Sequence, residues 1–444
     1  MANSYLTRSI SSTGTNTKGT FSGWIKRSEL TSNYPRFFAV NTDSNNYLRL
    51  FFHNDDKLHL YIDNGGSGIG QRKTTRLFRD TNAWYHIVVA IDSTLATAGD
   101  RIKIWVNGVQ ETAFDSTINP SQNADMKINN SGSTIVIGKH ENASSDYFSG
   151  YMSHVSWVDG SALAPTVFGE TDSTSGIWGF KSPSGVTWGT NGVHLKFENS
   201  GALGTDSSGN SNTFTVNGDL KQSIDTPSIV YPTLNVVANT NSNSTISDGA
   251  LTHTVSGQWL GAISSFGVTS GKWYAEAKIT DEQNFSIGFA TLVGSFVSNM
   301  NTANSGYVGK GDDSWGFWGN GANNAQKVHN NSATNYGSAF STNDIMILAM
   351  DVDNKKLYFG KNGTFFDSSN PATQASPAFT FTTTDPMSFA SGPENGAVQW
   401  NFGAGNFGDT PITSAGSNGN GSLFEYDVPS GFYALNTKNV NTYG

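Results

Sequence analysis

The sequence predicts an all-β protein made of two antiparallel β-sandwich domains in tandem. Short apolar and aromatic runs with period-two alternation recur along the chain, such as residues 47–52 (YLRLFF) and 84–91 (WYHIVVAI). Asn-Gly and Asp-Gly pairs stand between such runs and supply the positive φ angles of tight hairpins. We find no amphipathic segment of helix length with a cap at each end. These three observations favour antiparallel sandwiches over helical or mixed folds.

Further strands are expected in both halves of the chain. They are residues 57–62 (KLHLYI), 101–106 (RIKIWV), 134–137 (TIVI), 271–279 (GKWYAEAKI), 284–290 (NFSIGFA), 314–319 (SWGFWG), 344–351 (DIMILAMD) and 356–366 (KLYFGKNGTFF). Type I′ hairpin turns are expected at five pairs, namely Asn64-Gly65, Asn107-Gly108, Asp159-Gly160, Asn217-Gly218 and Asn362-Gly363.

A domain boundary is expected near residue 222. The 444 residues suit two sandwiches of roughly 200 to 250 residues each. Residues 221–237 contain Pro227 and Pro232, which favour extended or turn structure, and a polar stretch (NTNSNSTISDG) follows. We therefore expect domains at residues 1–222 and 223–444.

Composition limits the classes of partner. The chain has no cysteine, so thiolate metal sites, disulfides and Cys nucleophiles are excluded. Neither an apolar leader nor a run of about 18 apolar residues is present, so we expect synthesis in a cytoplasm and no membrane insertion. The net charge of −9 and pI of about 5.3 lack the basic footprint of a nucleic-acid binder. Residues up to 110 nevertheless carry +5 and the remainder −14. A basic cluster at Arg72, Lys73, Arg76 and Arg79 fits a solvated loop better than a phosphate site.

Four segments in the first half share a recognisable pattern. They are residues 21–27 (FSGWIKR), 84–91, 101–109 (RIKIWVNGV) and 147–158 (YFSGYMSHVSWV), and in their order and spacing they resemble the laminin G-like, concanavalin A-type jelly roll over residues 1–160. Residues 192–218 resemble the terminal strands of the same module. Gly150 is expected where another backbone approaches its strand closely.

The laminin G-like resemblance implies calcium and a glycan or protein ligand at one end of the sandwich. Calcium takes about six to eight oxygen ligands from carboxylates, amides and carbonyls. The candidates by position are Asp43, Asp63, Asn64, Asn142 and Asp146. Ordinary Asn and Asp turn residues are the competing explanation for all five.

The second half carries another pattern. The expected strands from residue 271 onward are similar to the SPRY domain in order, spacing and identity over residues 245–410. That resemblance implies ligand binding, without catalysis, by loops that would hold Tyr307, Asp312, Asp313 and Asn320. Trp315 and Trp318 lie three apart, so on a strand they face opposite sides, one toward the core and one available to a ligand.

The tandem arrangement suggests a biological setting. Residues 398–408 (VQWNFGAGNFG) and 429–438 (PSGFYALNTK) resemble the endings of SPRY-containing structural proteins in phages of marine bacteria. The resemblance implies a non-catalytic virion protein of the fibre or adhesin type on the particle surface, which binds other virion proteins and a host-surface glycan or protein. It also implies trimeric assembly by analogy, although no coiled-coil seam enforces a trimer and the oligomeric state stays open.

Two alternatives remain. In the first, the chain is a purely structural capsid-decoration or tail protein that binds only other virion subunits. The second is a glycan-cleaving enzyme, which would need two carboxylates about 5 to 9.5 Å apart. The nine Glu residues never form the E-x-D-x-E type of spacing that would place such a pair on one strand, and no G-x-S-x-G elbow or P-loop occurs.

Overall fold

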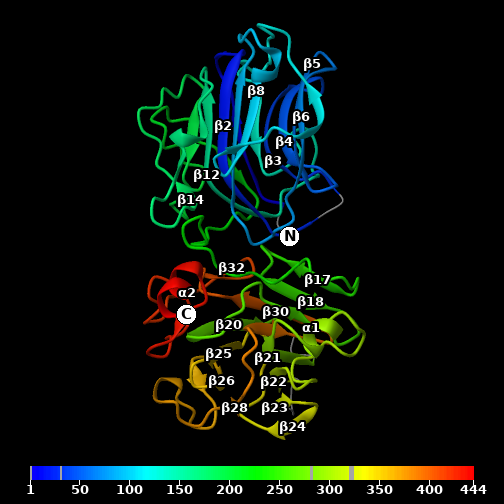
Figure 1. The fold of residues 1–444 in the computed structure, drawn as a ribbon, viewed down its shortest axis with the longest axis vertical. Coiled ribbons are helices and arrows are strands. Elements are labelled where there is room, and N and C mark those ends of the chain that lie inside the picture. The colour runs from blue at the N-terminus through cyan, green and yellow to red at the C-terminus, as the bar shows by residue number, and fades with distance from the viewer. Residues whose placement is uncertain (1–2, 31–32, 281–283, 320–324) are drawn as a thin grey trace. The chain divides into compact units, whose positions relative to one another are not determined.

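The computed structural model describes residues 3–30, 33–280, 284–319 and 325–444, and it confirms the all-β class (Figure 1). The chain divides into two compact units, Met1–Gln222 and Ser223–Gly444. All named strand pairs are antiparallel except one, between β20 and β33. In the part of the chain described, no helix has the length and apolar character needed to cross a membrane.

The first unit is a sandwich of two sheets. The eight-stranded sheet runs, in spatial order, β10 (Phe114–Ile118), β6 (Ser67–Leu77), β5 (Lys57–Asn64), β4 (Asn46–Phe52), β3 (Arg36–Asp43), β11 (Thr134–Ile137), β1 (Tyr5–Ser9) and β16 (Thr215–Asn217). The six-stranded sheet runs β15 (Val193–Leu195), β12 (Gly150–Asp159), β2 (Lys18–Arg27), β7 (Tyr85–Asp92), β8 (Ile102–Val106) and β9 (Val109–Gln110). A small hairpin joins β13 (Gly169–Thr171) to β14 (Trp178–Phe180), and two 3₁₀ turns lie at Ala98–Asp100 and Pro165–Val167.

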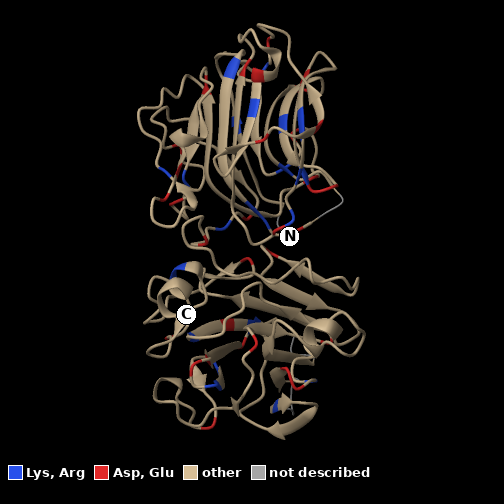
Figure 2. Ribbon diagram, in the orientation of Figure 1, with Lys and Arg blue, Asp and Glu red and all other residues tan. Residues whose placement is uncertain are grey.

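The core of this unit lies between its two sheets because alternate residues of each strand point inward. On β4 the inward residues are Leu48, Leu50 and Phe52, and on β5 they are Leu58, Leu60 and Ile62. All six are at most 1% exposed. The alternation therefore turns the remaining residues of these two strands to the outer face. Figure 2 shows positions of basic and acidic residues interspersed along the ribbon of this unit.

The second unit is also a two-sheet sandwich. One sheet runs β17 (Ser244–Ser247), β18 (Thr252–Val255), β30 (Gly396–Asn401), β20 (Lys272–Ile279), β25 (Ile345–Asp351), β26 (Lys356–Lys361) and β27 (Thr364–Phe365), with β28 (Phe379–Thr380) on β26 and β33 (Tyr433–Ala434) on β20. The other runs β19 (Ala262–Ile263), β29 (Met387–Ser391), β21 (Phe285–Thr291), β22 (Ser314–Gly319), β23 (Gln326–His329) and β24 (Ser332–Asn335). The remaining elements are β31 (Asn406–Phe407), β32 (Thr410–Pro411), the helices α1 (Ser295–Asn299) and α2 (Thr437–Tyr443), and a 3₁₀ turn at Pro371–Thr373.

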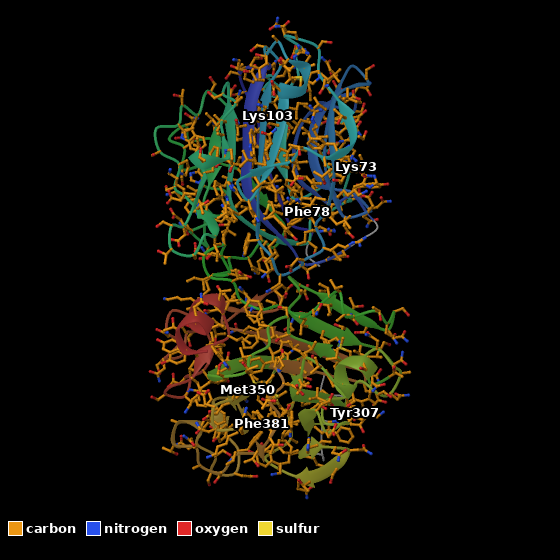
Figure 3. All side chains as sticks on the ribbon, viewed as in Figure 1. Lys73, Phe78, Lys103, Tyr307, Met350 and Phe381 are labelled. Carbon is orange, nitrogen blue, oxygen red and sulfur yellow. The ribbon has the colours of Figure 1, made fainter. Side chains whose placement is uncertain are left out.

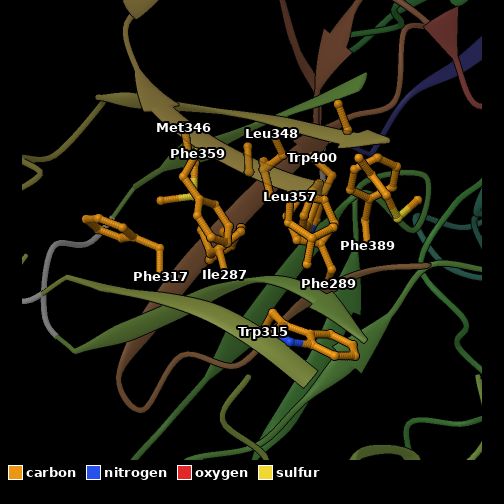
Figure 4. Close-up of a cluster of buried hydrophobic side chains, with 14 of the residues drawn as sticks. Ile287, Phe289, Trp315, Phe317, Met346, Leu348, Leu357, Phe359, Phe389 and Trp400 are labelled. Carbon is orange, nitrogen blue, oxygen red and sulfur yellow. The ribbon is translucent and has the colours of Figure 1, made fainter. Parts of the chain in front are cut away.

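Aromatic and aliphatic side chains from both sheets fill the core of the second unit (Figure 4). Phe289 of β21 contacts Phe359 of β26 from the opposite sheet, with ring centroids 5.3 Å apart, and Phe389 of β29 at 5.7 Å. Trp400 is completely buried beside Phe389. Aromatic residues of the two sheets therefore interdigitate, which joins the sheets into one packed core.

Two of the five expected hairpin turns have the type I′ signature. Asn107-Gly108 and Asn362-Gly363 both have positive φ at each position, and they join β8 to β9 and β26 to β27. The expectation at Asn64-Gly65 is wrong by one residue, since the positive φ angles fall on Gly65 and Gly66.

The other two pairs do not make hairpins at all. Asp159-Gly160 and Asn217-Gly218 have a positive φ only at the glycine, and each follows a strand whose next neighbour in sequence is not its pairing partner. The chain leaves the sheet at both places, so the glycine ends a strand without reversing it onto a neighbour.

Gly150 allows the close approach that the sequence indicated. A Cβ atom built on it would lie 2.1 Å from the carbonyl oxygen of Lys26 on β2, which is far inside van der Waals contact. Its φ of 154° also lies in the region that favours glycine. Only glycine therefore permits β12 to pair with β2 at this position.

Candidate ligand-binding site

Three aromatic side chains of the second unit gather on the side of the β22 sheet that faces away from the core. Trp318 belongs to β22, Tyr307 (labelled in Figure 3) to the segment between α1 and β22, and Trp259 to the segment before β19. The Trp259 and Trp318 rings are nearly parallel, at 21°, with centroids 5.4 Å apart. Tyr307 lies 5.0 Å from Trp318 and 5.7 Å from Trp259. We call these three residues the aromatic corner.

Strand alternation determines which tryptophan of β22 reaches this side. Trp315 and Phe317 point into the core, and Trp315 is only 4% exposed. Trp315 stacks on His329 at 5.0 Å and contacts Phe381 at 5.6 Å. Trp315 offers no face to a ligand, so the expectation that it binds one is not supported by its position. Trp318 points to the opposite side of the sheet and is half-buried.

A glycine and two serines bring Tyr307 to Trp318. The segment around Val308 lies directly on β22, because a Cβ on Gly316 would be 2.2 Å from the carbonyl oxygen of Val308. The backbone N–H of Val308 donates to Ser286 Oγ at 2.8 Å, and the N–H of Gly309 donates to Ser314 Oγ at 3.0 Å. These contacts fix the segment on the sheet and hold Tyr307 in the aromatic corner.

Polar groups surround the aromatic corner. The Tyr307 hydroxyl donates to Asn331 Oδ1, and burial raises the pKa of Tyr307, so the phenol is neutral. Lys310 Nζ lies 5.5 Å from the Tyr307 ring centroid and donates to Ser305 Oγ at 2.8 Å. The indole N–H of Trp318 is buried and has no hydrogen-bond partner among the described residues.

This arrangement offers a ligand both aromatic surface and a hydrogen-bond donor. Half-buried aromatic surfaces take up an apolar face of a ligand, and an unpaired N–H offers one directed hydrogen bond. Leaving a buried donor unpaired costs about 1–3 kcal/mol, and a ligand acceptor would recover that cost.

The other three loop residues expected at this site differ in their surroundings. Asp313 accepts hydrogen bonds from Ser295 Oγ and from the backbone N–H of Phe296, both at 2.7 Å, so it anchors the first turn of α1. Asp312 is exposed to solvent. Asn320 lies outside the described residues.

Sequence reasoning did not identify Trp259. It stands in an irregular segment before the two-residue strand β19, where no periodic pattern marks it. Its position after Gly257 and Gln258, in a loop just before the strand, was the available signal.

The structure gives each of the five residues considered for calcium a partner within the protein. Asp43 accepts the backbone N–H of Asn45 at 2.8 Å and the Asn46 amide at 2.9 Å, and Asp63 accepts the N–H of Gly66 at 2.8 Å. The Asn64 amide donates to the carbonyl of Asp125 at 2.8 Å. Asp43 and Asp63 thus accept hydrogen bonds within turns, which is common for Asp.

Asn142 and Asp146 lie along β3 at well separated positions. Asn142 exchanges hydrogen bonds with Asn41, while Asp146 lies 3.8 Å from the guanidinium of Arg36. Arg36 and Asp43 are the two ends of β3, about 23 Å apart at roughly 3.3 Å per residue, so Asp146 and Asp43 cannot share one ion. Among the residues described, no three His, Asp or Glu side chains form a group that could hold a metal ion.

Comparison with known proteins identifies the two domains. Residues 2–167 match the model of the concanavalin A-like lectin/glucanases superfamily, and residues 272–403 match the SPRY domain model. The chain therefore carries a concanavalin A-like domain and a SPRY domain in tandem, both of them β-sandwiches.

Individual relatives match only part of the chain. It is 29% identical over 158 residues to the probable ATP-dependent RNA helicase ddx1 of Dictyostelium discoideum, a match covering 35% of this chain and 18% of the relative. It is 33% identical over 106 residues to the ATP-dependent RNA helicase DDX1 of Xenopus laevis, and this match covers 24% of this chain and 12% of the relative. The chain thus spans less than a fifth of the length of these relatives.

Solved structures with partial similarity include two SPRY domains. The SPRY domain of human HERC1 is 18% identical with a TM-score of 0.29, and the match covers 38% of this chain and 96% of that one. The TRIM65 PSpry domain is 15% identical with a TM-score of 0.29, and the match covers 38% of this chain and 89% of that domain.

Proposed function

We propose that this chain is a non-catalytic binding protein of a bacteriophage particle, of the fibre or adhesin type, and that the aromatic corner of its SPRY domain holds a host-surface glycan or protein. The single observation behind the binding site is the contact of the half-buried Trp259 and Trp318 with the buried Tyr307, together with the unpaired indole N–H of Trp318. The tandem domain order and the lack of cysteine support the virion setting, as does the resemblance of residues 398–408 and 429–438 to phage protein endings.

The composition of the aromatic corner matches what anchors ligands elsewhere. Tryptophan and tyrosine supply large rigid surfaces at a small loss of conformational entropy, and they dominate the binding energy of many interfaces. Here Ser286 and Ser314 fix the segment that carries Tyr307, so this ring is in place before any ligand arrives. Binding therefore needs little ordering of the protein.

The test measures binding of the purified full chain to intact cells of candidate bacterial hosts. We expect saturable, host-restricted binding that Trp318→Ala weakens about 30-fold, which corresponds to about 2 kcal/mol for an anchoring tryptophan. Trp318→Phe keeps an aromatic ring but lacks the N–H, so we expect an intermediate loss of about tenfold. Trp105→Ala is the matched control because Trp105 is also half-buried on a strand but lies in the other domain.

Treating the host cells separates the two ligand classes. Loss of binding after periodate oxidation identifies a glycan, and loss after protease treatment identifies a protein. Unchanged binding by Trp318→Ala would refute the aromatic corner as the site. Absence of binding to every host would contradict the adhesin proposal and favour a capsid or tail component whose partners are other virion subunits.

A further inference from the structure

One segment of the first domain lies across the outer face of the six-stranded sheet. It consists of residues 160–188, which follow β12 and precede β15, and it contains the hairpin of β13 and β14. Figure 1 labels β14 beside β12. Phe168 of this segment packs in one apolar cluster with Val88 of β7 and Val158 of β12. We call residues 160–188 the strap.

Three histidines of the sheet lie beneath the strap, and each stacks on one of its aromatic rings. The stacked pairs are His86 with Trp178 at 6.0 Å and 19°, His154 with Phe180 at 3.6 Å and 13°, and His194 with Trp188 at 5.6 Å and 16°. His194 points away from the core because its neighbours Val193 and Leu195 point into it, and His86 alternates in the same way with Ile87. The ring centroid of His154 lies 5.7 Å from that of His194, on the same side of the sheet.

The hydrogen bonds around these imidazoles leave no place for a second proton while the strap is closed. Trp178 Nε1 donates to His86 Nδ1 at 2.9 Å, so His86 carries its proton on Nε2, which lies 2.9 Å from Ser22 Oγ. Protonation of Nδ1 would break the bond to Trp178. His154 Nδ1 and His194 Nε2 are buried and have no partner among the described residues. An imidazolium has an N–H at both nitrogens, so each of these would become a buried donor without an acceptor.

Burial keeps the three imidazoles neutral. It lowers the pKa of His86 to about 3, and those of His154 and His194 to about 4. His86 is completely buried, and no charged side chain in the described part of the chain shifts its pKa. The cost of protonation therefore comes mainly from the cover that the strap and its neighbours provide.

Charged groups near the other two histidines have smaller effects than burial. His154 faces His194 and Lys196, which disfavour its protonation, and Glu198, which favours it. His194 faces Lys196 and also Asp206, whose carboxylate already accepts the backbone N–H of His194 at 2.9 Å. Other charged residues of the strap and of this sheet face do not shift these pKa values; they are Lys18, Lys26, Asp92, Lys103, Glu170, Asp172 and Lys181.

From the three stacked pairs and their unpartnered nitrogens we propose that the strap is an acid-released cover, which lifts from the six-stranded sheet when the histidines beneath it take up protons. In the described part of the chain, no backbone hydrogen bond joins residues 164–187 to this sheet, so opening leaves the strand pairing intact. Opening brings the imidazoles into water and uncovers Val88 and Val158. The domain then exposes an apolar face in acid that it hides at neutral pH.

The direction of the effect follows from proton linkage. Each histidine has a lower pKa in the closed state than its ordinary value of 6.5 in the open state, so its contribution to closure is complete above pH 6.5 and is lost as the pH falls toward 4. Together the three should raise the equilibrium constant for opening about 10⁴-fold between pH 7.5 and pH 5.

The experiment measures solvent exchange of indole N–H groups in the full chain, labelled at tryptophan for NMR, at pH 7.5 and pH 5. Trp178 reports the strap because its N–H is bonded to His86. Trp157 reports unfolding of the whole domain, because it is completely buried in the core and donates to Asn129 at 2.9 Å. After correction for intrinsic exchange, we expect opening at Trp178 to rise about 10⁴-fold in acid while Trp157 stays protected.

Glutamine variants test the origin of the pH dependence. The double variant His154→Gln/His194→Gln retains one of the three protonation sites, so the rise at Trp178 should be about 30-fold. The single variant His154→Gln, which should rise about 10³-fold, serves if the double variant does not fold. His59→Gln is the matched control, since His59 is also buried with a pKa of about 4 but lies on the other sheet. It should keep the wild-type rise.

Three results would overturn the proposal. The first is that exchange at Trp178 does not increase between pH 7.5 and pH 5. The second is that Trp178 and Trp157 lose protection together, because acid would then unfold the domain instead of releasing the strap. The third is a rise in the glutamine variants as large as in the wild type, which would show that the histidines beneath the strap do not control its opening.

Discussion

The buried carboxyl group of Glu276 should make the stability of the SPRY domain depend on pH. Glu276 lies on β20, is 0% exposed, and accepts the backbone N–H groups of Glu425 at 2.8 Å and Tyr426 at 2.9 Å. The Tyr274 hydroxyl donates to it at 3.0 Å, and the Asn401 amide approaches at 3.5 Å. It thereby ties the C-terminal segment to the outer side of the sheet. Burial raises the pKa of this carboxyl from 4.5 to about 7, although the N–H donors oppose the shift.

The sign follows from proton linkage. A carboxyl whose pKa is higher in the folded state binds more protons there, so its contribution to stability falls as the pH rises from 4.5 to 7. A shift of this size corresponds to about 3.4 kcal/mol, of which about 2.5 kcal/mol lies between pH 5 and pH 8. Glu276→Gln keeps the shape and removes the titration.

The assay is urea unfolding of the full wild-type chain and of Glu276→Gln at pH 5 and pH 8. Amide hydrogen exchange of residues 422–427 would report the local stability of the segment that Glu276 holds. Gln presents an N–H₂ group to backbone donors, so the variant is less stable at both pH values, by about 1–3 kcal/mol at pH 8. The stability difference between wild type and variant should be about 2.5 kcal/mol larger at pH 5 than at pH 8. A difference that stays constant, or that grows toward pH 8, would refute the reasoning.

Three further predictions concern other buried or constrained groups. Burial lowers the pKa of His253 to about 3, below its unfolded value of 6.5, so its contribution to stability is present above pH 6.5 and is lost as the pH falls toward 3. Replacing His253 by Gln should make the free energy of unfolding depend less on pH between pH 6.5 and 4 than it does in the wild type. An unchanged dependence on pH would contradict this. Gly316→Ala should lift the Val308 segment off β22, destabilise the domain by about 1–3 kcal/mol and weaken ligand binding at the aromatic corner, whereas wild-type stability would show that the close approach is not needed. Chelation with EGTA should leave the melting temperature of the first domain unchanged, because the carboxylates of Asp43, Asp63 and Asp146 serve turns and an ion pair; a fall of several degrees would restore the calcium site.

Local patterns in the sequence were enough to predict several of the central strands and, within them, which residues alternate between the two faces. The alternation in residues 47–52 and 57–62 separates Leu48, Leu50 and Leu60 in the core from Arg49 and Tyr61 on the surface. In the same way, the spacing of Trp315 and Trp318 placed them on opposite sides of β22 before the structure showed which one is buried. Period-two alternation is a property of a single strand, so it survives without knowledge of the fold.

Turn geometry was less predictable because the neighbouring strands decide it. Asn107-Gly108 and Asp159-Gly160 look alike in sequence, but only the first joins two paired strands. The helix α2 was not predicted, because it is only seven residues long. It is capped by Asn436, whose side chain accepts the N–H of Asn439 at 2.9 Å. Elements this short depend on their packing rather than on a periodic pattern.

The sequence by itself determined the all-β class, about half of the longer strands of the two sandwiches and the presence of tryptophan and tyrosine on strands. Only the tertiary structure decided which residues meet. Trp259, Tyr307 and Trp318 come from segments up to 59 residues apart, and the phenol end of Tyr61 lies close over Gly68 of the next strand, which has no side chain. Sheet register and loop packing set such contacts, and both depend on the whole chain folding around its cores, which no short stretch of sequence encodes.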